Sequence, residues 1–345
     1  MRMLIAIALT TLCYSAPLQA QDVANRTISL IVGFAPGGGT DVVARKIAAF
    51  YPKYLPGSPS MVVRNVPGGG GITAANFFVQ QVKPDGLTIL VGSSTTADPQ
   101  FYRQPQAVFD PSQFGIIGGV GMGGSAMVIS REAEARLRDK SAAPAVIGVT
   151  GGLPRSGMQA AAWGIEFLGW NARWVVGYRG TNDLIYALER GEVAMTSTGN
   201  MYHVERLLSS GNFKILTQTG SYTNEQFGPR PEFGDAGLIT EMLRGRIKED
   251  VAAQAFTYWS TLTALDKWLA LPPGAPVGMR DLYRAGFEKL VKDTDFVEQS
   301  KGVSEAFEAM SAGDIEKLVF TLKNTPPQAI AYISTMLRRQ GLTVD

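Results

Sequence analysis

The stretch ISLIVGFAPGGGTDVVARKIAAFYPKYL, residues 28–55, decides the fold. It begins as an apolar run that ends at Pro36 and three successive glycines. Apolar residues then recur at spacings of three and four from Val42 to Tyr54. These patterns predict a buried strand, a glycine turn and a helix with one apolar face. Thr40 or Asp41 is expected to cap that helix at its N-terminus.

The glycine loop between this strand and helix has two interpretations. Gly37, Gly38 and Gly39 leave backbone N–H groups uncovered at the positive end of a helix, where an anion can approach them closely. The same residues also suit a tight turn that requires positive φ angles. The loop alone does not decide between an anion site and a plain turn.

The N-terminal residues have the layout of a secretory signal peptide. Arg2 precedes an apolar run from Met3 to Leu12, and small and polar residues follow as far as Ala20. We expect residues 1–20 to be removed by cleavage near Ala20 and the mature protein to be exported to the periplasm. The single cysteine, Cys13, lies inside this segment. The mature chain is therefore expected to have neither disulfides nor thiol chemistry.

Length and composition restrict the class of protein. The chain has 345 residues, 45% hydrophobic and 18% charged, which fits a globular protein large enough for two domains. Lysine and arginine total 32, against 30 for aspartate and glutamate. This near balance gives no electrostatic footprint for nucleic acid, so we expect no nucleic-acid partner.

The opening pattern repeats along the first third of the chain. A second strand, Ser60 to Asn65, is followed by four glycines and a helix, and a third strand ends in the hydroxyls of Ser93 and Ser94. Strands and helices that alternate with short links predict right-handed crossovers and a parallel sheet. Ligands bind at the carboxyl ends of such strands, where the first glycine loop and the two serines both fall.

A second α/β set predicts a second lobe. It has a strand at 145–149, a loop from Thr150 to Gly157, a helix, and later strands that end near Tyr178 and Thr198. A formal G-x-G-x-x-G begins at Gly119, but the helix that a dinucleotide site needs does not follow it. We therefore expect residues 114–130 to form a strand pair or a segment that crosses between the lobes. The predicted division is residues 21–123 and 253–345 for lobe 1 and residues 124–252 for lobe 2, with 279–339 helical.

The sequence has few residues in the patterns that enzymes use for catalysis. His203 is the only histidine, and the sequence has no G-x-S-x-G nucleophile elbow whose serine it could deprotonate. We therefore expect His203 to have a structural role. No H-E-x-x-H motif or paired ligands indicate a metal, and no cofactor motif is complete. A binding protein without catalysis is the preferred hypothesis, and a secreted hydrolase that uses Ser156 or Ser94 is an alternative. Arg155 and Arg179 are candidates for carboxylate contacts, although each also fits a solvated surface charge.

Motifs along most of the mature chain resemble one family. GFAPGGGTDVVAR, VRNVPGGGGITAANFF, KPDGLTILVGSS, GVTGGLPRSG, VVGYRGTNDLIYALERGEVAM, RPEFGDAG and LPPGAP occur in that order. They are similar to motifs of the Bug (TctC-like) extracytoplasmic solute receptors, the substrate-binding proteins of tripartite tricarboxylate transporters. The resemblance implies a type II periplasmic-binding-protein fold, an α/β venus flytrap in which each lobe is a mostly parallel sheet flanked by helices.

The resemblance also implies a site and a function. A small organic mono- or dicarboxylate would be held between Pro36–Asp41 of one lobe and Thr150–Gly157 of the other, and a monomer would deliver it to the membrane subunits of a tripartite transporter. A receptor that feeds a membrane sensor kinase is the alternative. This chain departs from the family pattern at Gly177, Arg179 and Ala194, so the resemblance implies the carboxylate contacts of the first lobe but not the contacts to the distal half of the ligand. The candidate ligand-binding residues are Phe34, Pro36, Gly37, Gly38, Gly39, Thr40, Asp41, Ser93, Ser94, Thr150, Gly151, Gly152, Arg155, Ser156, Gly157, Tyr178, Arg179, Gly180, Ser197 and Thr198.

Overall fold

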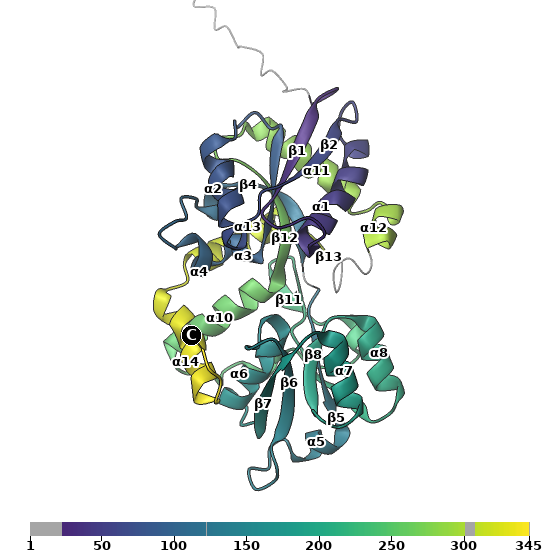
Figure 1. Ribbon diagram of the computed structural model, residues 1–345, viewed down its shortest axis with the longest axis vertical. Helices are drawn as coiled ribbons and strands as arrows, with labels where there is room; N and C mark the ends of the chain where they lie inside the picture. The colour runs from purple at the N-terminus through teal and green to yellow at the C-terminus, as the bar shows by residue number, and fades with distance from the viewer. Residues whose placement is uncertain (1–22, 122, 301–307, 345) are drawn as a thin grey trace, which may run out of the picture.

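Two β-sheets form the centres of two lobes in the computed structural model, which describes residues 23–121, 123–300 and 308–344 (Figure 1). The predicted signal peptide, residues 1–20, lies outside the described residues. The first sheet has the strand order β13-β4-β12-β3-β1-β2. Its strands are β1 (Thr27–Val32), β2 (Ser60–Asn65), β3 (Thr88–Ser93), β4 (Gly115–Gly121), β12 (Leu265–Leu271) and β13 (Glu308–Met310).

The second sheet has the order β7-β6-β8-β5-β9, and a separate hairpin pairs β10 with β11. The strands are β5 (Ala126–Ser130), β6 (Ala145–Thr150), β7 (Ala172–Tyr178), β8 (Met195–Thr198), β9 (Phe213–Gln218), β10 (Ser221–Thr223) and β11 (Gln226–Gly228). The helices are α1 (Gly39–Phe50), α2 (Ile72–Gln81), α3 (Ser94–Ala97), α4 (Pro99–Tyr102), α5 (Arg131–Arg136), α6 (Ala160–Phe167), α7 (Thr181–Glu189), α8 (Met201–Ser209), α9 (Ile239–Leu243), α10 (Asp250–Ala264), α11 (Val277–Leu290), α12 (Thr294–Ser300), α13 (Ala312–Lys323) and α14 (Pro327–Arg339).

Both sheets are mixed, so the expectation of mostly parallel sheets is only partly correct. Strand β1 pairs in parallel with β2 and β3, and β6 pairs in parallel with β7 and β8. Strands β12 and β13 join the first sheet antiparallel, and β5 joins the second antiparallel to β8 and β9. Of the strands next to the crossings between the lobes, β12 and β5 run against both of their neighbours, whereas β4 runs in the same direction as β1, β2 and β3. The two-lobed α/β architecture itself is confirmed.

Apolar stripes of the helices explain the layers of the first lobe. In one buried cluster, α1 and α11 cover the face of the sheet that carries Leu30, Val32 and Val91. In another, α2 and α13 cover the opposite face, which carries Ile31 and Leu90. Burial alternates between these two clusters along β1 and β3 because successive side chains point to opposite faces of a sheet. Strands β1 and β3 are thus buried on both faces.

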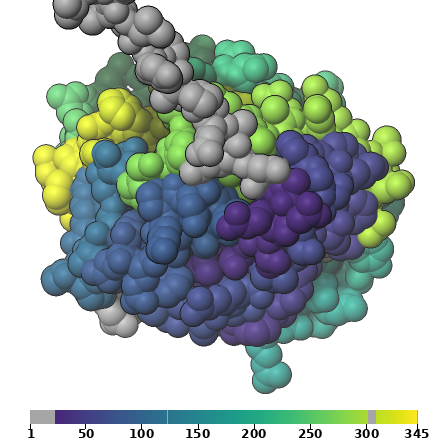
Figure 2. All heavy atoms as spheres, turned by 90° about the horizontal axis from the view of Figure 1, so that it is seen from above, coloured from purple at the N-terminus to yellow at the C-terminus, as the bar shows by residue number. Residues whose placement is uncertain are grey.

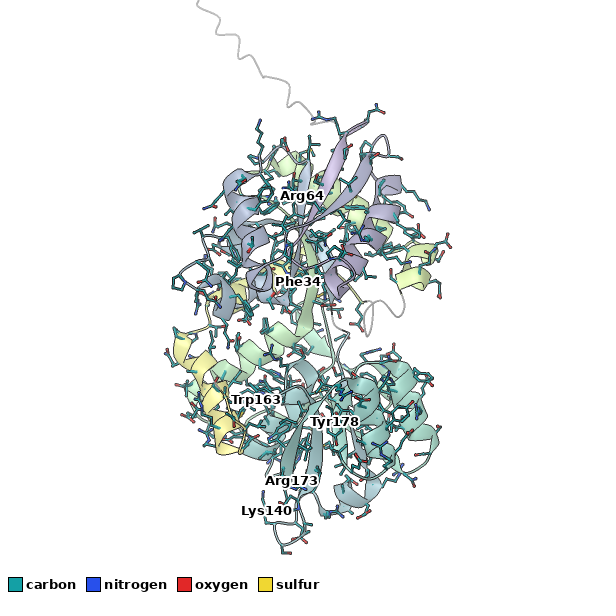
Figure 3. The ribbon with its side chains drawn as sticks, viewed as in Figure 1. Phe34, Arg64, Lys140, Trp163, Arg173 and Tyr178 are labelled. Atoms are coloured by element: carbon teal, nitrogen blue, oxygen red, sulfur yellow. The ribbon has the colours of Figure 1, made fainter. Side chains whose placement is uncertain are left out.

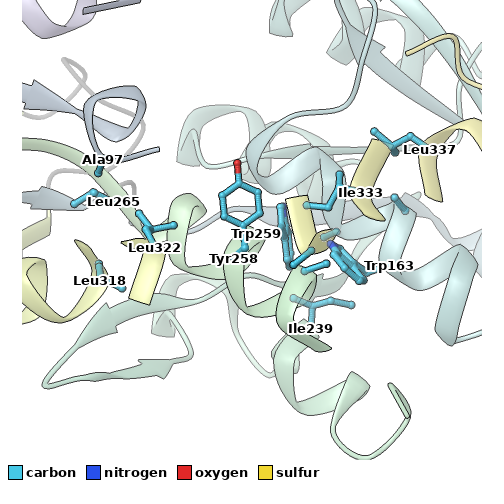
Figure 4. Close-up of a cluster of buried hydrophobic side chains, with 14 of the residues drawn as sticks. Ala97, Trp163, Ile239, Tyr258, Trp259, Leu265, Leu318, Leu322, Ile333 and Leu337 are labelled. Carbon is cyan, nitrogen blue, oxygen red and sulfur yellow. The ribbon is translucent and has the colours of Figure 1, made fainter. Parts of the chain in front are cut away.

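The end of the chain returns to both lobes. Figure 2 shows the outer end of the first lobe, where residues of the first third (purple to blue) lie beside residues from near 280 onward (green to yellow). Helix α14 packs against α10 and α6, and Trp163, Trp259 and Ile333 lie together in the buried cluster that joins these helices (Figure 4). Aromatic packing here ties the second lobe to the helix that leads back to the first.

The chain crosses between the lobes where the sequence predicts. Strands β4 and β5 belong to different sheets and only residues 122–125 separate them, so residues 114–130 do cross between the lobes. Helix α10 leads directly into β12 of the first sheet. The proposed boundaries at 123/124 and 252/253 stay a prediction, and the second of them falls inside α10. The predicted helical region 279–339 also contains the short strand β13, which the sequence analysis missed.

Among the residues that the structure describes, no helix is both long and apolar enough to span a bilayer.

Candidate functional site

The first candidate loop presents free amides at the start of α1. Ala35 to Gly39 are exposed, and the loop turns through a hydrogen bond from the Gly38 N–H to the Ala35 carbonyl oxygen at 3.2 Å. The first helical hydrogen bond runs from the Val42 N–H to the Gly38 carbonyl at 2.9 Å. The N–H groups of Gly39, Thr40 and Asp41 precede it and have no partner inside the helix. A 12-residue helix with such a start is suited to an anion.

Asp41 fixes the shape of this loop and does not cap the helix. The helix begins at Gly39 with Gly38 in the N-cap position and no side-chain cap, so the expectation of a Thr40 or Asp41 cap is wrong. The Asp41 carboxylate accepts the Gly37 N–H at 2.8 Å and the Arg45 guanidinium at 2.8 and 3.0 Å. Asp41 lies inside the first turn, so its side chain accepts the N–H of a residue that precedes the helix, Gly37. The side chain of a capping residue instead accepts an N–H from the helix that follows it.

Arg45 compensates the charge of Asp41, and Asn65 adds a neutral hydrogen-bond donor. The hydrogen bonds from Arg45 lower its pKa from 3.8 to about 2, with the Gly37 and Asn65 hydrogen bonds also lowering it and burial opposing them. Asn65, at the end of β2, donates its amide both to Asp41 at 2.8 Å and to the Phe34 carbonyl at 2.9 Å. Because Arg45 compensates this carboxylate, it does not repel an anion at the neighbouring amides.

Ser93 and Ser94 end the third strand at the same edge of the sheet. Ser93 is buried, its hydroxyl lies 2.8 Å from the Thr95 hydroxyl, and its carbonyl accepts the Trp268 indole N–H at 3.0 Å. Ser94 is half-buried at the start of the short helix α3. The Ser93 hydroxyl is thus held by local partners, while the strand end itself is where the sequence predicts it.

The second candidate loop, Thr150–Gly157, is tied to the end of β7. The Gly151 N–H donates to the Tyr178 carbonyl at 3.0 Å, and the Gly177 N–H donates to the Gly151 carbonyl at 2.6 Å. Gly151 and Gly152 are exposed, and a Cβ placed on either would meet nothing within 4 Å. These glycines therefore border open space. Tyr178 is half-buried beside them.

The end of this loop is held by a tryptophan from α10. Ser156 has a φ of 48°, a left-handed conformation that is uncommon for a residue other than glycine. The Trp259 indole N–H donates to the Ser156 carbonyl at 3.0 Å. Gly157 is buried, and a Cβ there would lie 2.5 Å from the Ser125 Oγ and 2.9 Å from the Ser197 Oγ. Gly157, Ser125 and Ser197 thus meet, and the sequence analysis missed Ser125.

The remaining candidates line the same edge of the second sheet. Arg155 and Arg179 are both exposed, and Gly180 is the N-cap residue of α7. Thr198 is buried, and its hydroxyl accepts the Asn200 N–H at 3.2 Å at the start of α8. The exposed guanidinium groups are free to contact solvent or a ligand.

The single histidine takes part in packing between two helices. His203 is buried on α8, and its Nε2 lies 2.9 Å from the Asn182 Oδ1 at the start of α7. Burial lowers its pKa. Its Nδ1 has no hydrogen-bond partner among the described residues. These contacts support the structural role predicted for His203 rather than a base for Ser156 or Ser94.

The candidate residues form two groups, one in each lobe. Figure 3 shows Phe34 at the end of the first lobe that is nearer the second, and Tyr178 at the end of the second lobe that is nearer the first. The carboxyl ends of β1 and β7 are therefore directed toward each other. Pro36–Asp41 follow β1, and Ser93 and Ser94 stand at the end of the neighbouring strand β3. Thr150–Gly157 contact the ends of β7 and β8. That both groups hold one ligand stays a prediction.

Comparison with known proteins gives matches in sequence and in fold. No family model matches the chain. A UPF0065 protein of Bordetella pertussis is 41% identical over 105 residues, which cover 30% of this chain and 31% of that protein. Protein BugT of the same organism is 38% identical over 91 residues, 26% of this chain and 27% of BugT. The chain thus matches less than a third of the length of these curated relatives.

Solved structures match over nearly the whole chain. A TctC solute binding protein from Polaromonas has a TM-score of 0.66 at 18% identity and covers 91% of this chain and 98% of its own. The periplasmic binding protein BugD has a TM-score of 0.50 at 21% identity, with 92% and 98% covered. A protein from R. palustris, solved with adipate, has a TM-score of 0.51 at 19% identity, with the same coverage. The fold is that of periplasmic solute-binding proteins, and the predicted resemblance to Bug (TctC-like) receptors is confirmed.

Proposed function

We propose that this protein is a periplasmic receptor that captures a small organic carboxylate, mono- or dicarboxylic, between its two lobes. It would then deliver the ligand to the membrane subunits of a tripartite tricarboxylate-type transporter. One observation carries the proposal: the exposed loop before α1 leads into the amides of Gly39, Thr40 and Asp41, which have no partner inside the helix, beside an aspartate that Arg45 already neutralises. Such a site favours a negatively charged group over a neutral one.

The second lobe supplies the complementary half. The glycines of the Thr150–Gly157 loop border open space, and the exposed Arg155 and Arg179 lie at the same edge of the second sheet. A micromolar ligand needs about 8 kcal/mol of binding free energy. Hydrogen bonds to a charged group contribute about 1.5–3 kcal/mol each. A few such bonds, shared between the lobes, are enough when apolar parts of the ligand are also buried.

The relatives support this class of ligand. The matched proteins include a TctC solute binding protein, a periplasmic binding protein named BugD and a protein solved with adipate, a dicarboxylate. Lobes joined by short crossings, such as the α10–β12 junction, can close around a ligand by a hinge motion.

The proposal is tested by calorimetry on the mature protein after unfolding and refolding to remove co-purified ligand. A panel of mono- and dicarboxylates should contain at least one that binds with micromolar affinity and raises the melting temperature. Absence of binding by every carboxylate, with the refolded protein shown to be native by circular dichroism, would contradict the proposal.

Position 39 offers a matched pair of variants for the anion site. Gly39 is the first residue of α1, where proline is tolerated, and Gly38 before it has the extended conformation (φ −73°, ψ 161°) that proline requires. Gly39→Pro removes one N–H from the site, and Gly39→Ala adds a Cβ but keeps that N–H. A Cβ at position 39 would meet nothing within 4 Å. We expect Gly39→Pro to weaken carboxylate binding by about tenfold or more and Gly39→Ala to weaken it far less.

A further inference from the structure

An ion pair that the sequence analysis did not single out lies at the ligand-facing edge of the first sheet. Strand β12 is antiparallel to β3, and its residue Lys267 is opposite Ser93. The first residues of β12 therefore lie at the carboxyl end of β3. Val32 of β1 is opposite Val91 of β3, and the two strands are parallel. Phe34 and Ser93, each two residues later, therefore lie at the same height along the sheet. Lys267, Ser93 and the start of the first candidate loop thus share one level of the sheet.

Lys267 lies on the same face of the sheet as α1. Leu269 and Leu271 of β12 belong to the buried cluster that α1 covers, together with Val91. A bulge separates Leu265 from Lys267, and the pairing with β3 is regular from Lys267 onward. Because side chains two apart point the same way in a strand, Lys267 shares the face of Leu269. The N-terminus of α1 lies at the carboxyl edge of that face.

The Lys267 ammonium is largely buried and paired with a neighbouring acid. Its side chain is 17% exposed and that of Asp266 is 9% exposed, and the ammonium contacts the Asp266 carboxylate. Burial raises the pKa of Asp266 because it removes water from the carboxylate, and the neighbouring Lys267 ammonium offsets this rise only in part. Neighbouring strands lie about 4.8 Å apart, and β3 separates β12 from β1, so the backbone of Lys267 lies about 10 Å across the sheet from that of Phe34 at the same level. A lysine side chain extends roughly 6 Å on a flexible stem, so its ammonium can reach the space beyond Ser93.

We propose that Lys267 binds a second carboxylate of the ligand and thereby selects dicarboxylates over monocarboxylates; this inference rests on the proposed function. The amides of Gly39 and Thr40 hold the first carboxylate. Lys267, one strand beyond Ser93, supplies a cation for the second. Asp266 holds the ammonium at the edge of the site when no ligand is bound and competes with the ligand for it. A buried ion pair adds little to stability by itself, so stability alone does not account for its position at this edge.

The test uses pairs of ligands that differ only in the second carboxylate: succinate with butyrate, glutarate with valerate, and adipate with hexanoate. Calorimetry compares the wild type with Lys267→Met and Asp266→Asn. We expect Lys267→Met to weaken binding of the dicarboxylates by about 10- to 100-fold and that of the monocarboxylates by less than about twofold. Asp266→Asn should tighten dicarboxylate binding by about two- to fivefold, because residue 266 then has no charge with which to compete for the Lys267 ammonium.

The second variant separates ligand recognition from a purely structural pair. If the pair only supports the fold, both variants lose affinity for mono- and dicarboxylates alike, which would overturn the inference. Should Lys267→Met fail to fold, Asp266→Asn decides alone, since weaker dicarboxylate binding by that variant would contradict competition for Lys267. Wild-type protein that binds no carboxylate at all would overturn the proposed function itself, whereas equal affinity for both members of each pair would overturn only the role of Lys267.

Discussion

The replacement Asp41→Asn tests whether the charge of this carboxylate stabilises the first lobe. In the wild type, Asp41 accepts hydrogen bonds from the Gly37 N–H, the Arg45 guanidinium and the Asn65 amide. Asparagine keeps the shape of the side chain, but it has no charge and only one acceptor oxygen. The variant therefore loses the charge-assisted contact with Arg45 and at least one further hydrogen bond.

The magnitude follows from the pKa of Asp41. A lowering from 3.8 to about 2 corresponds to about 2.5 kcal/mol in the free energy of unfolding when the carboxyl is fully ionised. The Arg45 side chain is 54% exposed, so solvent screens the pair and reduces its effect. We expect Asp41→Asn to lower the free energy of unfolding by about 1 kcal/mol at neutral pH.

The effect has a defined pH dependence. Because the pKa of Asp41 is lower in the folded state, its stabilisation is complete above about pH 4 and is lost as the pH falls toward about 2. Urea denaturation, followed by tryptophan fluorescence and circular dichroism, is to be measured at about pH 7 and about pH 3 for both proteins. The difference in unfolding free energy should shrink by about half between these two values.

A surface acid provides the matched control. Glu241 forms an exposed ion pair with Arg244 on α9, with side chains 49% and 76% exposed, and Glu241→Gln should change stability by less than about 0.5 kcal/mol. The reasoning is refuted if Asp41→Asn costs no more than this control. It is also refuted if the cost is the same at both pH values, because the loss would then come from shape and not from charge.

Two further substitutions test packing and the second loop. Gly92→Ala should destabilise the protein by about 1–3 kcal/mol, measured by thermal denaturation, because the new Cβ would lie 2.6 Å from the Trp268 indole; an unchanged melting temperature would show that the strands can separate at little cost. Trp259→Phe should weaken carboxylate binding by about threefold to tenfold in calorimetry, because the Ser156 carbonyl loses its 3.0 Å hydrogen bond, and unaltered affinity would show that this contact does not position the loop.

Local patterns were sufficient for the parts of the fold that depend on neighbouring residues. The strand at 28–32 was predicted from a continuous run of apolar residues, and the helix after Gly38 from apolar residues three and four positions apart. The cap was predicted wrongly because Asp41 has two competing uses, as a cap or as a partner for Arg45 four residues later on the same helix. An aspartate and arginine at that spacing are neighbours on a helix, so this signal was available in the sequence.

Pairing between distant segments could not be read from the sequence. Strand β12 inserts between β3 and β4 and runs against both, and nothing in the residues 265–271 specifies those partners. Strand β13 has three residues, too few to show a period. Contacts made by such insertions, above all the approach of Lys267 to Ser93, were missed for the same reason. The glycine loops were found because glycine is the usual residue where the backbone makes a tight turn with positive φ or is closely approached.

The central claim is that backbone amides of both lobes bind the same carboxylate. It is tested most directly by nuclear magnetic resonance of the ¹⁵N-labelled, ligand-free protein during titration with the carboxylate that binds best. The amide signals of Gly39 and Gly152 should shift together and give one dissociation constant. Shifts confined to one of these loops, or two different dissociation constants, would contradict the claim.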